Sequence, residues 1–171
     1  MSDPIRPEKL LALEPLLLLS KSLIYRNRDH QEAFCGKFII KKLFDICMFC
    51  YSRKELSQVY LASLFFLVCV QYRNNDAQQF FNEIITSSPR IQGVGGRSYM
   101  PPFSKAIACN ETFTRECHTI KLNHYNEEDV IESLEEIQKK LEPNLQEAQY
   151  ILMNTRGAVD ILIHCMSSES I

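Results

Sequence analysis

The sequence contains no tryptophan and little glycine or proline. Only 5 Gly and 7 Pro occur in 171 residues, which excludes a collagen-like or low-complexity chain. The apolar fraction of 46% and the charged fraction of 23% are typical of a globular protein, so disorder of the whole chain is not expected. At this length a chain buries about two-thirds of its unfolded surface and folds without a disulfide or a metal.

An excess of basic charge is also missing. The net charge is −2 at pH 7, which excludes a generally basic coat protein for nucleic acid. The charge is nevertheless uneven, because residues 126–171 hold 3 basic and 10 acidic side chains while the rest of the chain is mildly basic. Such an asymmetry predicts that the two parts pair with each other or present different faces to different partners.

The chain shows neither a recognisable secretory signal nor a long apolar run. Charged residues and prolines interrupt the first 15 positions, whereas a signal peptide needs a continuous apolar stretch. The longest uncharged segment, residues 56–72, has 17 residues and includes Ser57, Gln58, Ser63 and Gln71. This length is at the lower limit for a membrane span. We therefore expect a buried core helix and no membrane partner, with a membrane-associated helical protein as the alternative.

The seven cysteines are an odd number, and most of them lie among apolar residues. A reduced cysteine behaves as a small buried hydrophobe, and disulfides are rare in reducing compartments. The pattern predicts an intracellular protein with thiols at Cys35, Cys47, Cys50, Cys69 and Cys165.

Apolar residues at a spacing of three and four predict an all-α protein, an antiparallel helical bundle that forms a single domain over residues 1–171. Residues 1–87 are expected to form four helices with short links, which place neighbouring helices antiparallel. Helix starts are predicted where an N-cap residue precedes an acid or amide by three positions, at Asp29–Glu32, Ser52–Glu55 and Asn75–Gln78. Residues 126–171 are expected to form acidic C-terminal helices, interrupted at Glu142–Pro143.

Residues 88–125 differ from their surroundings. Glycines and prolines punctuate the first part, and threonines are frequent in the second part. This composition predicts one long irregular loop, in which a short hairpin around Asn110–Glu111 is one conformation open to the chain. Segments of this length are usually functional or disordered.

The expected hydrophobic core combines residues from the helices at both ends of the chain. Its members are Leu17, Phe38, Leu43, Leu64, Phe65, Phe81, Leu134 and Ile151.

No motif indicates catalysis or a cofactor, and we predict that the protein is not an enzyme. Cys47 and Cys50 have half of a zinc-site spacing, and Cys117, His118 and His124 could supply the rest. A second cysteine pair at finger spacing is missing, so core thiols are the better interpretation and no metal is predicted. A small thiol-dependent hydrolase that uses Cys117, His118 or His124 is an alternative.

The densest polar cluster lies between the first two long helical segments. It consists of Tyr25, Arg26, Asn27, Arg28 and His30, followed by Gln31. Arginine and asparagine side chains contact phosphates, and a tyrosine stacks on a base, so RNA or partner contact is one interpretation. The alternative is a turn whose side chains cap helix ends and form ion pairs.

The leucine-rich helix, this polar cluster and the aromatic residues that follow resemble a known family. In that family a leucine-rich segment precedes His-Arg-Asn-Lys-Asn-Gln-His-Arg and a tryptophan. Here Tyr25 stands at the first histidine, Arg26 and Asn27 match, Arg28 replaces lysine, and Phe34 or Phe38 takes the packing place of the tryptophan. Residues 16–50 thus resemble the accessory protein of fungal RNase MRP and the N-terminal domain of the nucleolus-and-neural-progenitor protein. The resemblance implies a nuclear RNA-processing assembly. The family's basic tail has no counterpart here, so the expected contact is with RNA or with a protein subunit that holds RNA.

Taken together, the sequence predicts a non-enzymatic helical subunit of a larger nuclear assembly whose partners are other protein subunits. The physical reason is a surplus of apolar helix surface, because residues 10–25 and 56–72 are apolar around most of their circumference. An adaptor subunit of a chromatin, kinetochore or meiotic complex is the alternative within the same class.

Overall fold

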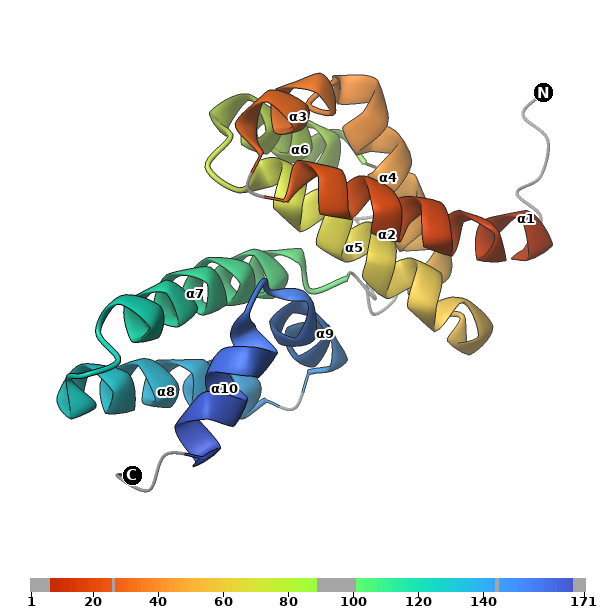
Figure 1. The fold of residues 1–171 in the computed structure, drawn as a ribbon. Helices are drawn as coiled ribbons and strands as arrows, with labels where there is room; N and C mark the ends of the chain where they lie inside the picture. Colours follow the sequence, from red (N-terminus) through yellow and green to blue (C-terminus); the bar gives the residue numbers. More distant parts are fainter. Residues whose placement is uncertain (1–6, 26, 89–100, 144, 168–171) are drawn as a thin grey trace, which may run out of the picture. The chain divides into compact units, whose positions relative to one another are not determined.

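The computed structural model describes residues 7–25, 27–88, 101–143 and 145–167, and within these ranges the chain is helical and has no strand (Figure 1). The all-α prediction is therefore confirmed. The chain divides into two compact units, a first unit of Met1–Phe103 and a second unit of Ser104–Ile171, each of which is described by itself. The expectation of a single domain over residues 1–171 stays a prediction.

The first unit is a set of short helices around one central helix. Its elements in chain order are α1 (Pro7–Leu11), α2 (Leu13–Ile24), α3 (Arg28–Ala33), α4 (Lys37–Cys50), a 3₁₀ turn η1 (Lys54–Leu56), α5 (Ser57–Gln71) and α6 (Asn75–Ser87).

The central helix is α5, as the uncharged run predicts. Every residue from Val59 to Gln71 is buried, and α2, α4, α3 and α6 all pack against it. A helix without a polar face is stable in a small protein only when neighbours cover all its sides. Among the described helices, none combines the length and the apolar character needed to cross a membrane.

Two asparagines begin helices of the first unit. The Oδ1 atom of Asn27 accepts a hydrogen bond from the His30 backbone N–H at 3.2 Å, and Oδ1 of Asn74 accepts one from the Ala77 N–H at 3.1 Å. Both caps precede the positions predicted from the sequence by one or two residues, because the N-cap residue must keep an extended backbone. The Ser52–Glu55 prediction is wrong, since the chain enters η1 from Arg53 without a side-chain cap.

Aromatic rings fill one end of the core of the first unit. The ring centroid of Phe44 lies 6.1 Å from that of Phe81 and 5.6 Å from that of Phe103, and the last two are 5.1 Å apart. Rings at these separations gain contact energy beyond the burial of their area.

Most of the predicted core residues are buried, and one prediction is wrong. Phe38 is 73% exposed. The buried face of α4 is formed by Ile40, Leu43, Phe44, Cys47 and Cys50, and at about 100° per residue Phe38 points away from that face. Leu134 is half-buried, and the others are buried: Leu17, Leu43, Leu64, Phe65, Phe81 and Ile151.

The second unit corrects the prediction for residues 88–125. Its helices are α7 (Phe103–Leu122), which begins at the last residue of the first unit, α8 (Glu127–Leu141), α9 (Gln146–Asn154) and α10 (Ala158–Ser167). The predicted irregular loop with a hairpin at Asn110–Glu111 is wrong over residues 103–122, and residues 89–100 lie outside the described part of the chain.

The prediction failed because the apolar residues of this segment follow a helical period, which the frequent threonines obscure in the sequence. Five apolar residues of α7 recur at intervals of three and four and are buried: Ala106, Cys109, Phe113, Cys117 and Ile120. Packing of this face outweighs the low helix propensity of threonine.

Helices α7 and α8 run antiparallel. Lys140, near the end of α8, interacts electrostatically with the Cys109 thiol in the first half of α7, and Glu136 of α8 interacts with Arg115 of α7. Near the connecting turn, the Asn123 side chain donates a hydrogen bond to Asp129 at 3.1 Å. The interruption predicted at Glu142–Pro143 is confirmed, because α8 ends at Leu141.

Candidate functional site

The predicted contact cluster lies at the end of α2 and in α3, where several of its side chains contact other parts of the same chain. Asn27 is the N-cap of α3, and Nδ1 of His30 is 2.9 Å from the Leu23 carbonyl oxygen. Tyr25 is half-buried, with its ring centroid 6.4 Å from that of Phe65. Arg26 lies outside the described residues. Arg28 is therefore the described member of the cluster most open to an external partner.

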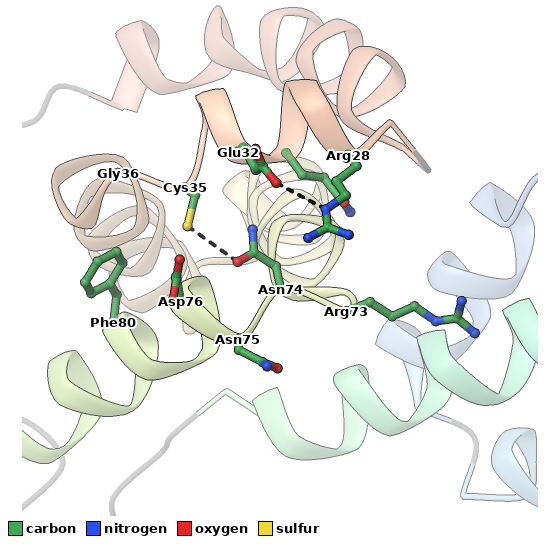
Figure 2. Close-up of a pocket in the computed structure, with 10 residues that line it drawn as sticks. Arg28, Glu32, Cys35, Gly36, Arg73, Asn74, Asn75, Asp76 and Phe80 are labelled. Atoms are coloured by element: carbon green, nitrogen blue, oxygen red, sulfur yellow. Dashed lines mark hydrogen bonds and ion pairs between the residues drawn. The ribbon is translucent and has the colours of Figure 1, made fainter.

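Arg28 borders a pocket between α3 and the turn that connects α5 to α6 (Figure 2). The pocket has a volume of about 620 Å³, within the range of ligand sites. Its lining residues are Arg28, Gln31, Glu32, Cys35, Gly36, Arg73, Asn74, Asn75, Asp76 and Phe80.

Polar contacts of Gln31, which is buried, and of Asn74, which is half-buried, fix the walls of the pocket. The Gln31 amide is buried and donates to the Cys69 carbonyl oxygen at 2.8 Å, which ties α3 to the end of α5. Asn74 Oδ1 accepts from the Ala77 N–H and also from the Cys35 thiol, whose sulfur is 3.6 Å away. Because each of these groups has a partner inside the fold, they shape the pocket and leave binding to the exposed side chains.

The exposed side chains around the pocket carry charges of both signs. The Arg28 guanidinium lies 3.1 Å from the Glu32 carboxylate, with side chains 88% and 63% exposed. Arg73 has a positive φ of 54° and extends away from α3, with its guanidinium 5.4 Å from the centroid of the Tyr72 ring (Figure 2). An ion pair this exposed contributes little to stability, so Arg28 can exchange Glu32 for an external acid at little cost.

The chemistry of the pocket is hydrogen bonding by amides and charged groups. Ligand pockets for organic substrates are lined mainly by apolar side chains, whereas the described residues that line this pocket include one aromatic side chain, Phe80. Burial raises the pKa of the Cys35 thiol, and a thiol held protonated is a poor nucleophile. The arrangement suits contact with a polar chain better than turnover of a small apolar molecule.

The residues weighed for zinc or catalysis are divided between the two units. Cys47 is buried in the first unit with its sulfur 3.2 Å from the Ser63 hydroxyl oxygen, and burial raises its pKa to about 12. In the second unit Cys117 is buried, whereas His118 and His124 are exposed. Within the described ranges, no group of three histidine, cysteine or acidic side chains is placed to hold a metal ion.

A second candidate surface lies on α2. This helix packs on α5 along one side, with α1 and α3 against its ends (Figure 1). Leu17 and Ile24 are buried on that side, whereas Leu16, Leu19 and Leu23 are 58%, 61% and 50% exposed. Together with exposed Ala12, which has a helical backbone, these three leucines form what we call the α2 leucine surface.

Neither candidate site was fully predictable from the sequence. The leucine-rich segment predicts uncovered apolar surface but not which leucines remain exposed. Arg73 and Asn74 carry no motif, and the one available signal was the Asn-Asn-Asp sequence that follows the uncharged helix. Comparison with protein-family models, with curated proteins and with solved structures finds no significant match to this chain.

Proposed function

We propose that this chain is a non-enzymatic interaction subunit that binds another protein chain through the α2 leucine surface. The observation that carries the proposal is the exposure of Leu16, Leu19 and Leu23 along one side of a helix whose opposite side is in the core. Contiguous exposed apolar side chains of this kind mark interaction sites in soluble proteins.

Burial of the exposed leucines against a partner stabilises a complex. Full burial of one leucine contributes about 1.5–3 kcal/mol, so covering the exposed half of each side chain contributes about 1 kcal/mol. Three leucines therefore favour association by about 3 kcal/mol, so this surface supports weak binding and a tight complex needs further contacts.

The setting we propose is a nuclear RNA-processing assembly. The α2 leucine surface and α3 both fall within or beside residues 16–50, which resemble the RNase MRP accessory family. The exposed Arg28 at the rim of the pocket suits contact with an acidic partner or with RNA held by another subunit. An adaptor role in a chromatin, kinetochore or meiotic complex uses the same surface and is the second candidate.

The test is affinity purification of the tagged full chain from cells, followed by mass spectrometry. The variant carries Leu16→Gln, Leu19→Gln and Leu23→Gln. Phe38→Gln is the matched control, because Phe38 is equally apolar and more exposed but lies on α4. We expect the triple variant to lose a defined set of proteins that the wild type and the control retain. Retention of the same proteins by the triple variant would contradict the proposal.

The identity of the lost proteins distinguishes the two settings. RNase MRP-type subunits and their RNA support the first, and chromosome-bound proteins support the second. Recovery of the triple variant as folded protein is verified by circular dichroism, because all three replaced side chains are exposed and their loss should leave the helix content unchanged.

A further inference from the structure

We propose that the occupant of the α2 leucine surface is a second copy of this chain, packed antiparallel to the first across a two-fold axis. This inference rests on the proposed function, which assigns the surface to protein binding. Three features of the surface support a second copy: the spacing of the exposed side chains, the charges around them and the size of the surface.

The intervals between the exposed side chains are the same when counted from either end of the helix. Ala12, Leu16, Leu19 and Leu23 are separated by four, three and four residues, which keeps them on one side of a helix. A two-fold interface needs such symmetry, because each residue must meet the partner that in turn meets it.

An antiparallel register follows from this spacing. With the axis between Leu17 and Leu18, Leu16 lies opposite Leu19 of the second copy, and Ala12 lies opposite Leu23. Each large terminal leucine then faces a small alanine, and large residues opposite small ones fill an interface without voids. A parallel pair would place Ala12 opposite Ala12 and leave a gap.

The charges favour a copy of this chain over a charged partner. At about 100° per residue, Glu14 and Lys21 project from the side of α2 opposite the leucine surface. Both are half-buried, and the Lys21 ammonium lies 5.1 Å from the centroid of the Phe65 ring. Among the described residues from 10 to 25, no charged side chain lies on the exposed side, so two copies meet without repulsion between like charges. Their helix dipoles also run in opposite directions.

The size of the surface predicts a weak, reversible dimer. A helix of 12 residues is about 18 Å long, so a pair of such helices buries less than the roughly 1,200–2,000 Å² of a stable interface. Association should therefore be weak and should increase with protein concentration.

The first test is sedimentation equilibrium of the purified full chain, from about 1 µM to about 200 µM, the range in which a weak complex forms. We expect the mass to rise from 19.9 kDa towards twice that value. Leu16→Gln with Leu19→Gln should weaken association at least tenfold, since about 1 kcal/mol is lost per side chain in each copy. The Phe38→Gln control should associate like the wild type. A mass of 19.9 kDa at all concentrations, or a dimer that the leucine changes do not affect, would overturn the inference.

The second test reports the register. Leu16→Cys and Leu19→Cys proteins are mixed and oxidised, with Phe38→Cys as the control; the seven native cysteines are all buried. We expect the mixed disulfide, which joins one Leu16→Cys chain to one Leu19→Cys chain, to exceed either homodimer several-fold. A preference for disulfides between two identical variants would indicate a parallel pair and overturn the antiparallel arrangement.

The two proposals fail in different ways. A monomeric wild type whose leucine variant still loses cellular proteins would overturn the self-association and leave the proposed function intact. A dimer that the leucine changes disrupt, without any change in the cellular proteins retained, would support the self-association and contradict the role in a larger assembly.

Discussion

At the scale of single residues, the polar segment after α2 combines two roles that its sequence did not separate. Asn27 and His30 contact backbone atoms of their own chain, whereas Arg28 extends into solvent with Glu32 as its partner. Residues that satisfy backbone groups support the fold, and a residue paired only at the surface is available for binding.

Arg28→Ala should separate binding from stability. We expect the free energy of unfolding to change by less than about 0.5 kcal/mol, because the ion pair it removes is exposed. If Arg28 contacts an RNA phosphate, the slope of log affinity against log salt should fall by about one unit. Glu32→Ala is the matched control, since it removes the same ion pair and keeps the cation. Equal loss of binding in both variants would show that Arg28 acts through the ion pair.

Two buried thiols should make the stability of the protein depend on pH above neutrality. Burial raises the pKa of Cys47 and of Cys69 from 9.0 to about 12. Between these pH values the unfolded chain releases protons that the folded chain retains, so the free energy of unfolding falls as the pH rises through 9. At about pH 10 each thiol should lower it by about 1.4 kcal/mol relative to neutral pH.

Urea unfolding of wild type and Cys69→Ala at neutral pH and at about pH 10 measures this effect. The alanine variant is less stable at each pH, but its loss between the two should be smaller than that of the wild type by the contribution of one thiol. An identical pH dependence in the two proteins would contradict the assignment to Cys69.

At the scale of elements, neighbouring asparagines show how one residue begins a helix while the next one does not. Asn74 has an extended backbone, caps α6 and accepts a second hydrogen bond from the Cys35 thiol. Asn75 is the first helical residue and is exposed. Helix α6 therefore depends on the first of the two amides.

Asn74→Ala should lower the free energy of unfolding by about 1–2 kcal/mol, the usual cost of losing an N-cap. Asn75→Ala should change it by less than about 0.5 kcal/mol, because an exposed helical position favours alanine. Thermal or urea unfolding of the two variants measures the difference. Equal effects would show that the cap does not stabilise α6.

At the scale of the whole molecule, the sequence predicts that the two compact units fold as a single domain. Phe65→Ala tests it, since Phe65 is fully buried in the central helix of the first unit. Removing such a ring costs about 3–5 kcal/mol.

If residues 1–171 form one cooperative domain, this substitution should reduce hydrogen-exchange protection in α8 as well as in α5, and by a similar free energy. We expect this result, with Leu122→Ala as an exposed control that leaves both helices protected. Loss of protection confined to the first unit would contradict the single-domain prediction and make each unit its own folding unit.

The sequence by itself determined the features that depend on local pattern. The uncharged segment at residues 56–72 predicted the buried helix α5, and the Glu142–Pro143 pair predicted the end of α8. The all-α class followed from the helical period in residues 1–87 and 126–171. In each case the physical cause lies within one continuous segment of the chain, so the pattern can be interpreted without knowing which other segments it contacts.

Tertiary structure decided which side of each helix is covered. Phe38 is exposed because α4 presents a different face to α5 and α6, and residues 103–122 are helical because one apolar face is buried despite the threonines. The pocket joins residues 28–36 to residues 73–80, and Leu16, Leu19 and Leu23 remain exposed because α5 covers only the opposite side of α2. Contacts between segments far apart in the chain set these outcomes, and a local pattern contains no information on which segments meet.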